Sequence, residues 1–209
     1  MQDNNKRSFT VPVLLLIIVT LAILCILFYS KNLLSGQNEQ SEAGKRLAEK
    51  YVNAQAYAAL LQGGAEQLLN ATSEIDRLHA KEKLGEARFA LGETQSLIAD
   101  AIRLQSGQSD EQIEASLSGM NKALGAEDSL LNTAGEHDGP LTESEKTALT
   151  AVVAVAKDAE AALKRYLVPS GVGGYRIMAD GGEWIDAVME AKSSLDALAV
   201  TLSEPNLKP

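Results

Sequence analysis

The feature that most constrains this chain is an uncharged apolar run near its N-terminus, FTVPVLLLIIVTLAILCILFY, from Phe9 to Tyr29. At about 1.5 Å per residue, a helix of this length spans roughly 31 Å, which matches the ~30 Å hydrocarbon core of a bilayer. Pro12 lies in the first turn of such a helix, where its missing N–H costs no hydrogen bond. The run therefore predicts one transmembrane anchor over residues 9–29.

A signal peptide, a lipoprotein signal and a pilin-like start all fit this run less well than an anchor does. A cleaved signal peptide has an apolar core of about 7–15 residues and a small-residue cleavage site, and the following LFYSKNLLSG offers no such site. A lipoprotein needs small residues before its cysteine, whereas the bulky Ile23 and Leu24 precede Cys25. The start SFTVPVLLLIIV is similar to that of mature pilins, but Ser8 and Val13 replace the glycine and glutamate of the pilin motif. An uncleaved anchor is the interpretation we keep.

Basic residues beside the run predict its orientation. Lys6, Arg7 and the α-amino group precede it, against Asp3, and Lys31 follows it. Because basic residues are enriched on the cytoplasmic side of a span, a short tail of residues 1–8 is expected in the cytoplasm. The remaining domain is expected outside the cell membrane. A second apolar run, ALTAVVAVA, is too short to span a bilayer and predicts a buried helix segment.

The part of the chain beyond the anchor is acidic and contains no cysteine. Of the 28 acidic and 19 basic side chains, only Asp3, Lys6 and Arg7 precede it. A surface with that balance repels nucleic acid and anionic lipid headgroups, so no nucleic-acid partner is expected. Cys25 lies inside the apolar run, which leaves the domain without a disulfide, a thiolate metal site or a cysteine nucleophile.

The segment after the anchor begins with a strict helical rhythm. After a polar linker over residues 30–40, apolar residues recur at alternating spacings of four and three, which predicts a helix from about Ser41 to Asn70. That helix crosses Gly63 and Gly64, which implies either a bend or another backbone packed closely against it. The apolar series consists of Leu47, Tyr51, Ala54, Ala58, Leu61, Ala65 and Leu68.

Four capping signals mark the starts of further helices, because a Ser, Thr or Asp N-cap accepts hydrogen bonds from the first helical turn. Ile75 and Leu78 are expected to open the apolar side of the first of these helices. No stretch alternates in the manner of a strand. The fold class is therefore predicted as all-α: an N-terminal transmembrane helix followed by an up-down helical bundle of about five helices, over residues 41–204, with a tail at 205–209. The signals pair Ser73 with Asp76, Ser109 with Gln112, Thr142 with Glu145, and Asp180 with Glu183.

Three patterns resemble metal, catalytic or phosphate sites but are more typical of solvated helix faces and turns. His79 shares a helix face with Asp76 and Glu82, yet a di-metal bundle needs such motifs on two helices, so no metal site is expected. The EHD turn at residues 136–138 is typical of a solvated loop. GVGG lacks the Lys-Ser/Thr of a phosphate loop. Neither histidine has a Ser-His-Asp context, so we expect no catalytic residues and no cofactor, and interpret the chain as non-enzymatic.

A glycine-rich stretch, VPSGVGGYRIMADGGEWID, interrupts the helices at residues 168–186. We predict a connection of about 14 residues, over 169–182, that lets the last helix return along the bundle. Two interpretations of its aromatic and basic residues stay open. In one, Trp184 caps the core and Arg176 stacks on an exposed ring face. In the other, Tyr175, Arg176 and Trp184 form a recognition loop that binds a partner.

Two functions fit these patterns. The first is a non-enzymatic, single-pass, membrane-anchored interaction or scaffold protein, which binds a protein partner or itself through the heptad series. The second is an extracytoplasmic ligand-binding or sensory module, which resembles four-helix sensor domains in general form and needs a separate membrane partner to transmit a signal. Short linkers, alanine richness and the lack of cysteine in the domain are typical of a bacterial cell-envelope protein.

Overall fold

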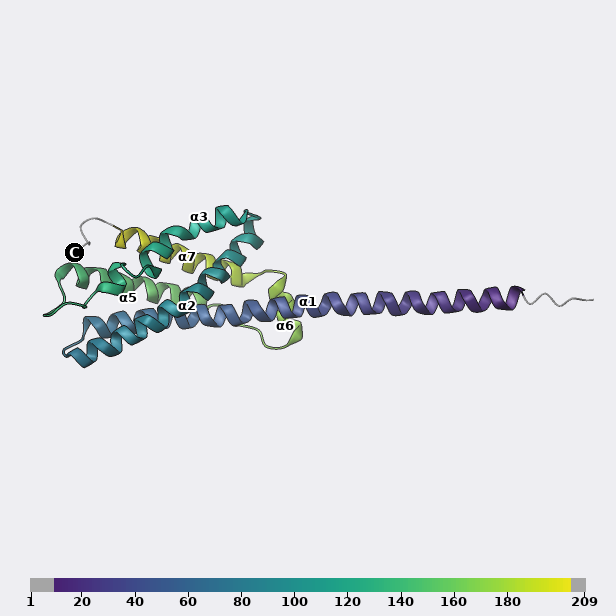
Figure 1. Cartoon of the computed structure of the whole chain (residues 1–209), viewed down its shortest axis with the longest axis horizontal. Coiled ribbons are helices and arrows are strands. Elements are labelled where there is room, and N and C mark those ends of the chain that lie inside the picture. Colours follow the sequence, from purple (N-terminus) through teal and green to yellow (C-terminus); the bar gives the residue numbers. More distant parts are fainter. Residues whose placement is uncertain (1–9, 204–209) are drawn as a thin grey trace, which may run out of the picture.

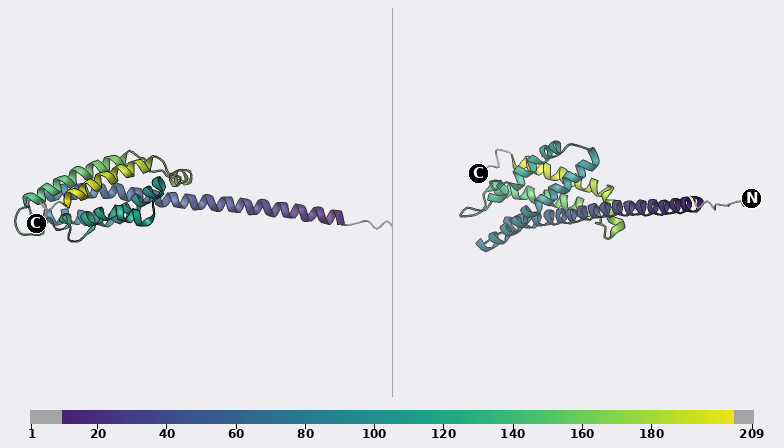
Figure 2. Two further views of the ribbon diagram at one scale, coloured as in Figure 1. Left: turned by 90° about the horizontal axis from the view of Figure 1, so that it is seen from above. Right: turned by 45° about the vertical axis from the view of Figure 1, so that its right-hand side comes forward.

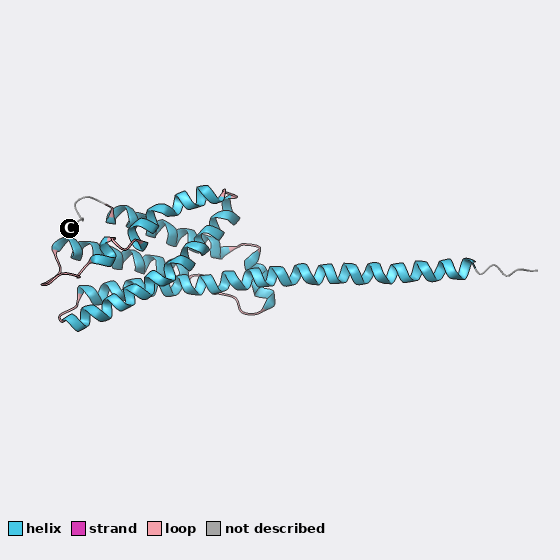
Figure 3. Ribbon diagram, in the orientation of Figure 1, coloured by secondary structure: helices cyan, strands magenta, loops and turns pink. Residues whose placement is uncertain are grey.

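The computed structural model describes residues 10–203, with side chains from Pro12 onward. Within that range every regular element is helical, and the chain runs from one long apolar helix into a helical bundle (Figure 1 and Figure 3). The predicted tails at 1–8 and 205–209, and the first residue of the predicted anchor, Phe9, lie outside the described residues. The elements are α1 (Thr10–Leu69), α2 (Glu74–Ser106), α3 (Asp110–Met120), the π-helical turn η1 (Asn121–Gly125), α4 (Leu130–Thr133), α5 (Glu143–Lys164), α6 (Val172–Ala179) and α7 (Glu183–Leu202).

Helix α1 is continuous over 60 residues, from the apolar run into the bundle. The predicted start of a helix at about Ser41 is corrected, because the polar linker over residues 30–40 is itself helical. The segment SGQNEQS has one glycine, no proline and several good helix formers, so the helical hydrogen bonds continue through it. At about 1.5 Å per residue α1 is roughly 90 Å long, and its apolar half projects well beyond the other helices (Figure 1).

The bundle is built around α1, α2, α7 and α5, each packed against its two neighbours in that cyclic order. Figure 2 shows the helices of the bundle gathered around the C-terminal part of α1, while its N-terminal part stands free of them. The chain runs out along α1, returns along α2, runs out again through α3, η1 and α4, returns along α5 and ends outward along α7 (Figure 1). This is the predicted up-down arrangement, and its turns lie at the two ends of the bundle.

The heptad series of α1 forms the spine of the core. All seven of its residues are buried, and Tyr51, Ala65 and Leu68 have no exposed surface. Gly64 explains the predicted close approach, because an added Cβ would lie 2.8 Å from Cγ and 3.1 Å from the backbone nitrogen of Leu84 on α2. The series therefore closes inside its own bundle.

The capping predictions were right for three helices and wrong for the fourth. Ser73, Ser109 and Thr142 each form a reciprocal capping box with the residue three positions on. Helix α7 instead has Gly182 at its N-cap, without a side-chain hydrogen bond. Asp180 is unavailable there because it ends α6 and accepts a hydrogen bond from Gln40 of α1.

The glycine-rich connection is not one long loop, because its middle forms α6. The expected connection over residues 169–182 is corrected in this respect. Helix α6 lies against α1 (Figure 1), and its main chain touches α1 so closely that a Cβ added to Gly44 would overlap the carbonyl group of Tyr175. Tertiary packing against α1 outweighs the poor helix propensity of Gly173 and Gly174.

We expect Gly44→Ala to detach or shift α6, since the methyl group meets backbone rather than a flexible side chain. The free energy of unfolding should fall by about 1–3 kcal/mol, as for other overpacked sites. Urea unfolding and protease cleavage within residues 165–182 measure the two effects. Gly36→Ala is the matched control, because it lies on the same helix with no atom within 4 Å of the added Cβ. Equal stability of the two variants would contradict the close packing of α6.

Candidate functional site

The three residues predicted to bind a partner lie at the end of the bundle nearest the apolar half of α1. Trp184 has no exposed surface, and its Nε1–H donates to the carbonyl of Met178 at 3.0 Å. This placement agrees with Trp184 as a core residue rather than as a contact for another molecule. The predicted stacking of Arg176 on an exposed ring face is wrong for Trp184, because the ring is fully buried.

Tyr175 and Arg176 are half-buried and help to join α6 to α1. The Arg176 Nε–H donates to the carbonyl of Gln37 at 3.2 Å, and Tyr175 packs against the core. Around them Leu167 and Ile177 are largely exposed, at 90% and 72%. A partner-binding role for Tyr175 and Arg176 therefore stays a prediction. The Nε–H of Arg176 already bonds to α1, which leaves fewer polar groups for a partner than the sequence suggested.

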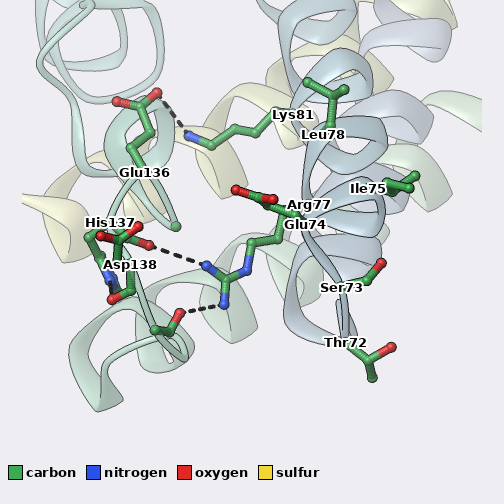
Figure 4. Close-up of a pocket in the computed structure, with 12 residues that line it drawn as sticks. Thr72, Ser73, Glu74, Ile75, Arg77, Leu78, Lys81, Glu136, His137 and Asp138 are labelled. Carbon is green, nitrogen blue, oxygen red and sulfur yellow. Dashed lines mark hydrogen bonds and ion pairs between the residues drawn. The ribbon is translucent and has the colours of Figure 1, made fainter.

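A second candidate site lies at the far end of the bundle, where the first turns of α2 face the loop before α5. These elements enclose a cleft of about 670 Å³ (Figure 4). Its walls combine two exposed apolar residues of α2, Ile75 and Leu78, with charged side chains from both elements. The remaining lining residues are Thr72, Ser73, Glu74, Arg77, Lys81, Gly135, Glu136, His137, Asp138 and Gly139.

Ile75 and Leu78 correct the sequence interpretation of α2. Both were expected on its core side, but they are 66% and 67% exposed. The buried side of α2 begins instead at Ala80 and Leu84. Among the described residues, the loop at 135–139 lies opposite the first turns of α2. The side chains of Ile75 and Leu78 therefore line the cleft between the two instead of entering the core.

Two basic side chains of α2 hold this loop in place. Arg77 donates to the carbonyl groups of His137 and Gly139 (Figure 4). Lys81 donates to the carbonyl of Asn132. Lys81 also lies 3.4 Å from the Glu136 carboxylate. Burial lowers the pKa of Lys81, and the Glu136 charge opposes that shift. Most donors of the cleft are thus engaged by the loop backbone.

Glu145, the capping-box residue of α5, anchors the loop from the other side. Its side chain is 10% exposed and accepts hydrogen bonds from Gly135 N at 2.7 Å, Thr142 N at 2.7 Å and Thr142 Oγ1 at 2.9 Å. His137 Nε2 lies 2.9 Å from the same carboxylate. Burial disfavours the charge of Glu145, but the hydrogen bonds from His137, Gly135 and Thr142 outweigh it and lower the pKa to about 2.

His137 is the opposite partner of this pair. Its Nε2 faces the Glu145 carboxylate and its Nδ1 faces the carbonyl of Asp138 at 3.1 Å, so both ring nitrogens are placed to donate. That arrangement favours the imidazolium form. The hydrogen bond to Glu145 and that to Asp138 therefore raise the pKa of His137 above its ordinary value of 6.5.

The pair predicts a stability maximum in mildly acidic solution. His137 stabilises the fold fully below pH 6.5, and this contribution is lost as the pH rises through its raised pKa. Glu145 stabilises it above pH 4.5, and that contribution is lost as the pH falls towards 2. The urea midpoints of the wild type and of His137→Asn should differ most between pH 4.5 and pH 6.5. A difference that stays constant from mildly acidic to alkaline pH would contradict the pairing.

The other histidine, His79, does not line the cleft. His79 is exposed and lies 3.6 Å from Glu82, while Asp76 serves the cap of α2 by accepting from Ser73 and Thr72. Within residues 12–203, no group of three or more His, Cys, Asp and Glu side chains is arranged to hold a metal ion.

The sequence interpretation missed the role of the EHD turn. It is not a freely solvated loop, because His137 pairs with the N-terminal turn of α5. The nearby capping box was the available signal, since a carboxylate at that position already faces the chain preceding the helix.

Comparison with protein-family models, curated proteins and solved structures finds no match for this chain.

Proposed function

We propose that this chain is a single-pass, membrane-anchored helical interaction protein of a bacterial cell envelope, with its N-terminus in the cytoplasm and its bundle outside. The observation that carries the proposal is the solvent exposure of the apolar half of α1. Its large apolar side chains from Val13 to Phe28 are between 47% and 79% exposed, and every residue from 12 to 36 is exposed. So much apolar surface is unfavourable in water and is covered in a bilayer.

The bundle supports the interaction part of the proposal. The bundle buries its own core from Leu47 to Leu202, so it holds a defined surface at a distance from the membrane. The continuous α1 joins the two parts without a flexible hinge. A domain of this kind presents its surface to other molecules at the membrane.

Membrane retention of the full chain tests the anchor. We expect the chain to stay in the membrane fraction after washing with alkaline carbonate and to be released by detergent. The double substitution Ile17→Asp and Leu21→Asp should release it, because each charge near the centre of a span costs about 2.5–3.5 kcal/mol. Leu104→Asp is the control, because Leu104 is 48% exposed on α2 of the bundle. Release of the unaltered chain by carbonate would contradict the proposal.

The cleft beside the first turns of α2 supports a second function, ligand binding by the bundle. It combines apolar walls with charged groups, which is the usual make-up of small-molecule sites. A thermal-shift screen of the full chain in detergent should find stabilising compounds whose effect is lost in Leu78→Ala. If no compound stabilises the wild type more than that variant, this second function has no support.

A further inference from the structure

Helix α2 carries a second apolar stripe that faces away from the core. Phe89, the one phenylalanine of the sequence beyond Phe28, is 92% exposed on it. Gly85 and Gly92 lie one turn before and after Phe89, and a Cβ on either would meet no atom within 4 Å. With the exposed Ile75 and Leu78, these residues form what we call the outer seam: Ile75, Leu78, Glu82, Gly85, Phe89 and Gly92, all exposed.

The outer seam has the spacing of a coiled-coil interface. Its residues alternate at intervals of three and four, which keeps them on one line along the helix. The residues that α2 buries in the bundle, among them Leu84, Leu91 and Ile98, fall on the opposite side. The bundle core covers only the inner side of α2. At the start of the outer seam, Ile75 and Leu78 line the cleft beside the loop at 135–139 and stay largely exposed.

The two flanks of the outer seam carry opposite charges. Lys81 and Arg88 lie on one flank, each directly before a seam residue, and the exposed Glu86 and Glu93 lie on the other, each directly after one. In a parallel pair of helices, a residue on the first flank meets the residue five positions later on the second flank of the partner helix. Arg88, which lies 3.4 Å from the exposed Glu127 of its own chain, would then meet Glu93. Lys81 is already held by the Asn132 carbonyl and by Glu136, so the Arg88–Glu93 pair carries the charge argument. In an antiparallel pair, like charges would face each other.

We propose that α2 pairs in parallel with α2 of a second copy of this chain through the outer seam. The proposal rests on the proposed function, since two copies anchored in one membrane point their α2 helices the same way. The glycines leave room beside the Phe89 rings, so large and small layers alternate along the pair. The flanking charges favour this partner and this orientation over an unrelated helix.

The outer seam is short, so the dimer needs a high local concentration of the chain. From Ile75 to Gly92 it is about 26 Å long, so two copies bury less surface than a standard stable interface. Confinement to one membrane raises the effective concentration of the second copy, so the pair is expected between anchored chains.

Glu82 is the charged residue within the outer seam, and a parallel pair sets two copies of it against each other. The His79 ring on the same helix lies 3.6 Å from its carboxylate. The opposed carboxylates weaken the pair at neutral pH. Glu82→Leu should therefore strengthen the dimer, which a purely structural role of this exposed residue would not do.

Cysteine cross-linking of the full chain in membranes tests the pairing. In a Cys25→Ser background, Phe89→Cys should form a cross-linked dimer severalfold more than Val200→Cys, a control that is 68% exposed on α7. Adding Glu82→Leu should raise the cross-linked fraction. Arg88→Glu should lower it, and Arg88→Glu combined with Glu93→Arg should restore it.

Three outcomes would overturn the proposal: equal cross-linking at the two cysteines, failure of the charge exchange to restore the dimer, or an adduct with a different protein at position 89. Carbonate washing of the same membranes tests the anchor separately. Retained chains without cross-linking at position 89 reject the pairing alone, whereas release by carbonate rejects the proposed function.

Discussion

Trp184→Ala is expected to lower the free energy of unfolding by about 3–5 kcal/mol, as for other large aromatic side chains removed from a core. Trp184 has no exposed surface, and its ring packs at the start of α7 where α6 turns back. The substitution opens a cavity and removes the Nε1–H bond to the Met178 carbonyl, which keeps its bond from the Gly181 N–H at 3.2 Å. Urea unfolding of the full chain in detergent, followed by circular dichroism, measures the loss.

Trp184→Phe is the control for this prediction. It keeps most of the apolar volume and removes the Nε1–H bond, so the loss should be about 1–3 kcal/mol. If both variants were as stable as the wild type, Trp184 would not be a core residue, and the recognition-loop interpretation of this segment would regain support.

Glu145→Gln is expected to lower the free energy of unfolding by about 2–3 kcal/mol. The amide can accept fewer of the converging hydrogen bonds, and a partly buried N–H bond from Gly135 or Thr142 loses its acceptor. The loop at residues 135–139 should become easier to cleave by protease. Stability should also lose its His137-dependent decline at alkaline pH, because the carboxylate that raises the pKa of His137 is gone.

Glu143→Gln is the matched control, since Glu143 lies in the same helical turn and its side chain is 90% exposed. Its loss should stay below about 1 kcal/mol, as for exposed ion pairs. Equal losses in the two variants would mean that Glu145 acts only through the helix dipole and not as the anchor of the loop.

Much of the fold followed from local rules that act over a few residues. The heptad series from Leu47 to Leu68 is buried throughout, because residues at those spacings share one side of a helix. The boxes at Ser73, Ser109 and Thr142 formed as expected, because each uses only groups within the same turn.

The features that escaped prediction depend on contacts between distant segments. Helix α6 exists because Gly44, far away in the sequence, lets its main chain approach α1. Ile75 and Leu78 match a helical apolar pattern, but periodicity does not say which of two sides the bundle covers. The anchoring of the EHD turn needed the position of Glu145 relative to His137, which only the folded chain provides.

The structure also changes where self-association is expected. The sequence interpretation allowed self-association through the heptad series of α1, which charged substitutions such as Tyr51→Glu or Ala58→Glu would disrupt. Those residues are buried inside one bundle, so such substitutions should unfold the domain instead. The exposed side of α2 takes the place of α1 as the surface for a second copy.

The proposed topology depends most on α1 joining a membrane-embedded half to a bundle outside the cell. Labelling with a membrane-impermeant maleimide on intact bacterial spheroplasts tests this directly. Leu167→Cys in a Cys25→Ser background should react, because Leu167 is 90% exposed on the bundle. Cys25 of the unaltered chain should react only after detergent is added. Reaction of Cys25 in intact spheroplasts, or protection of position 167 until lysis, would contradict this topology.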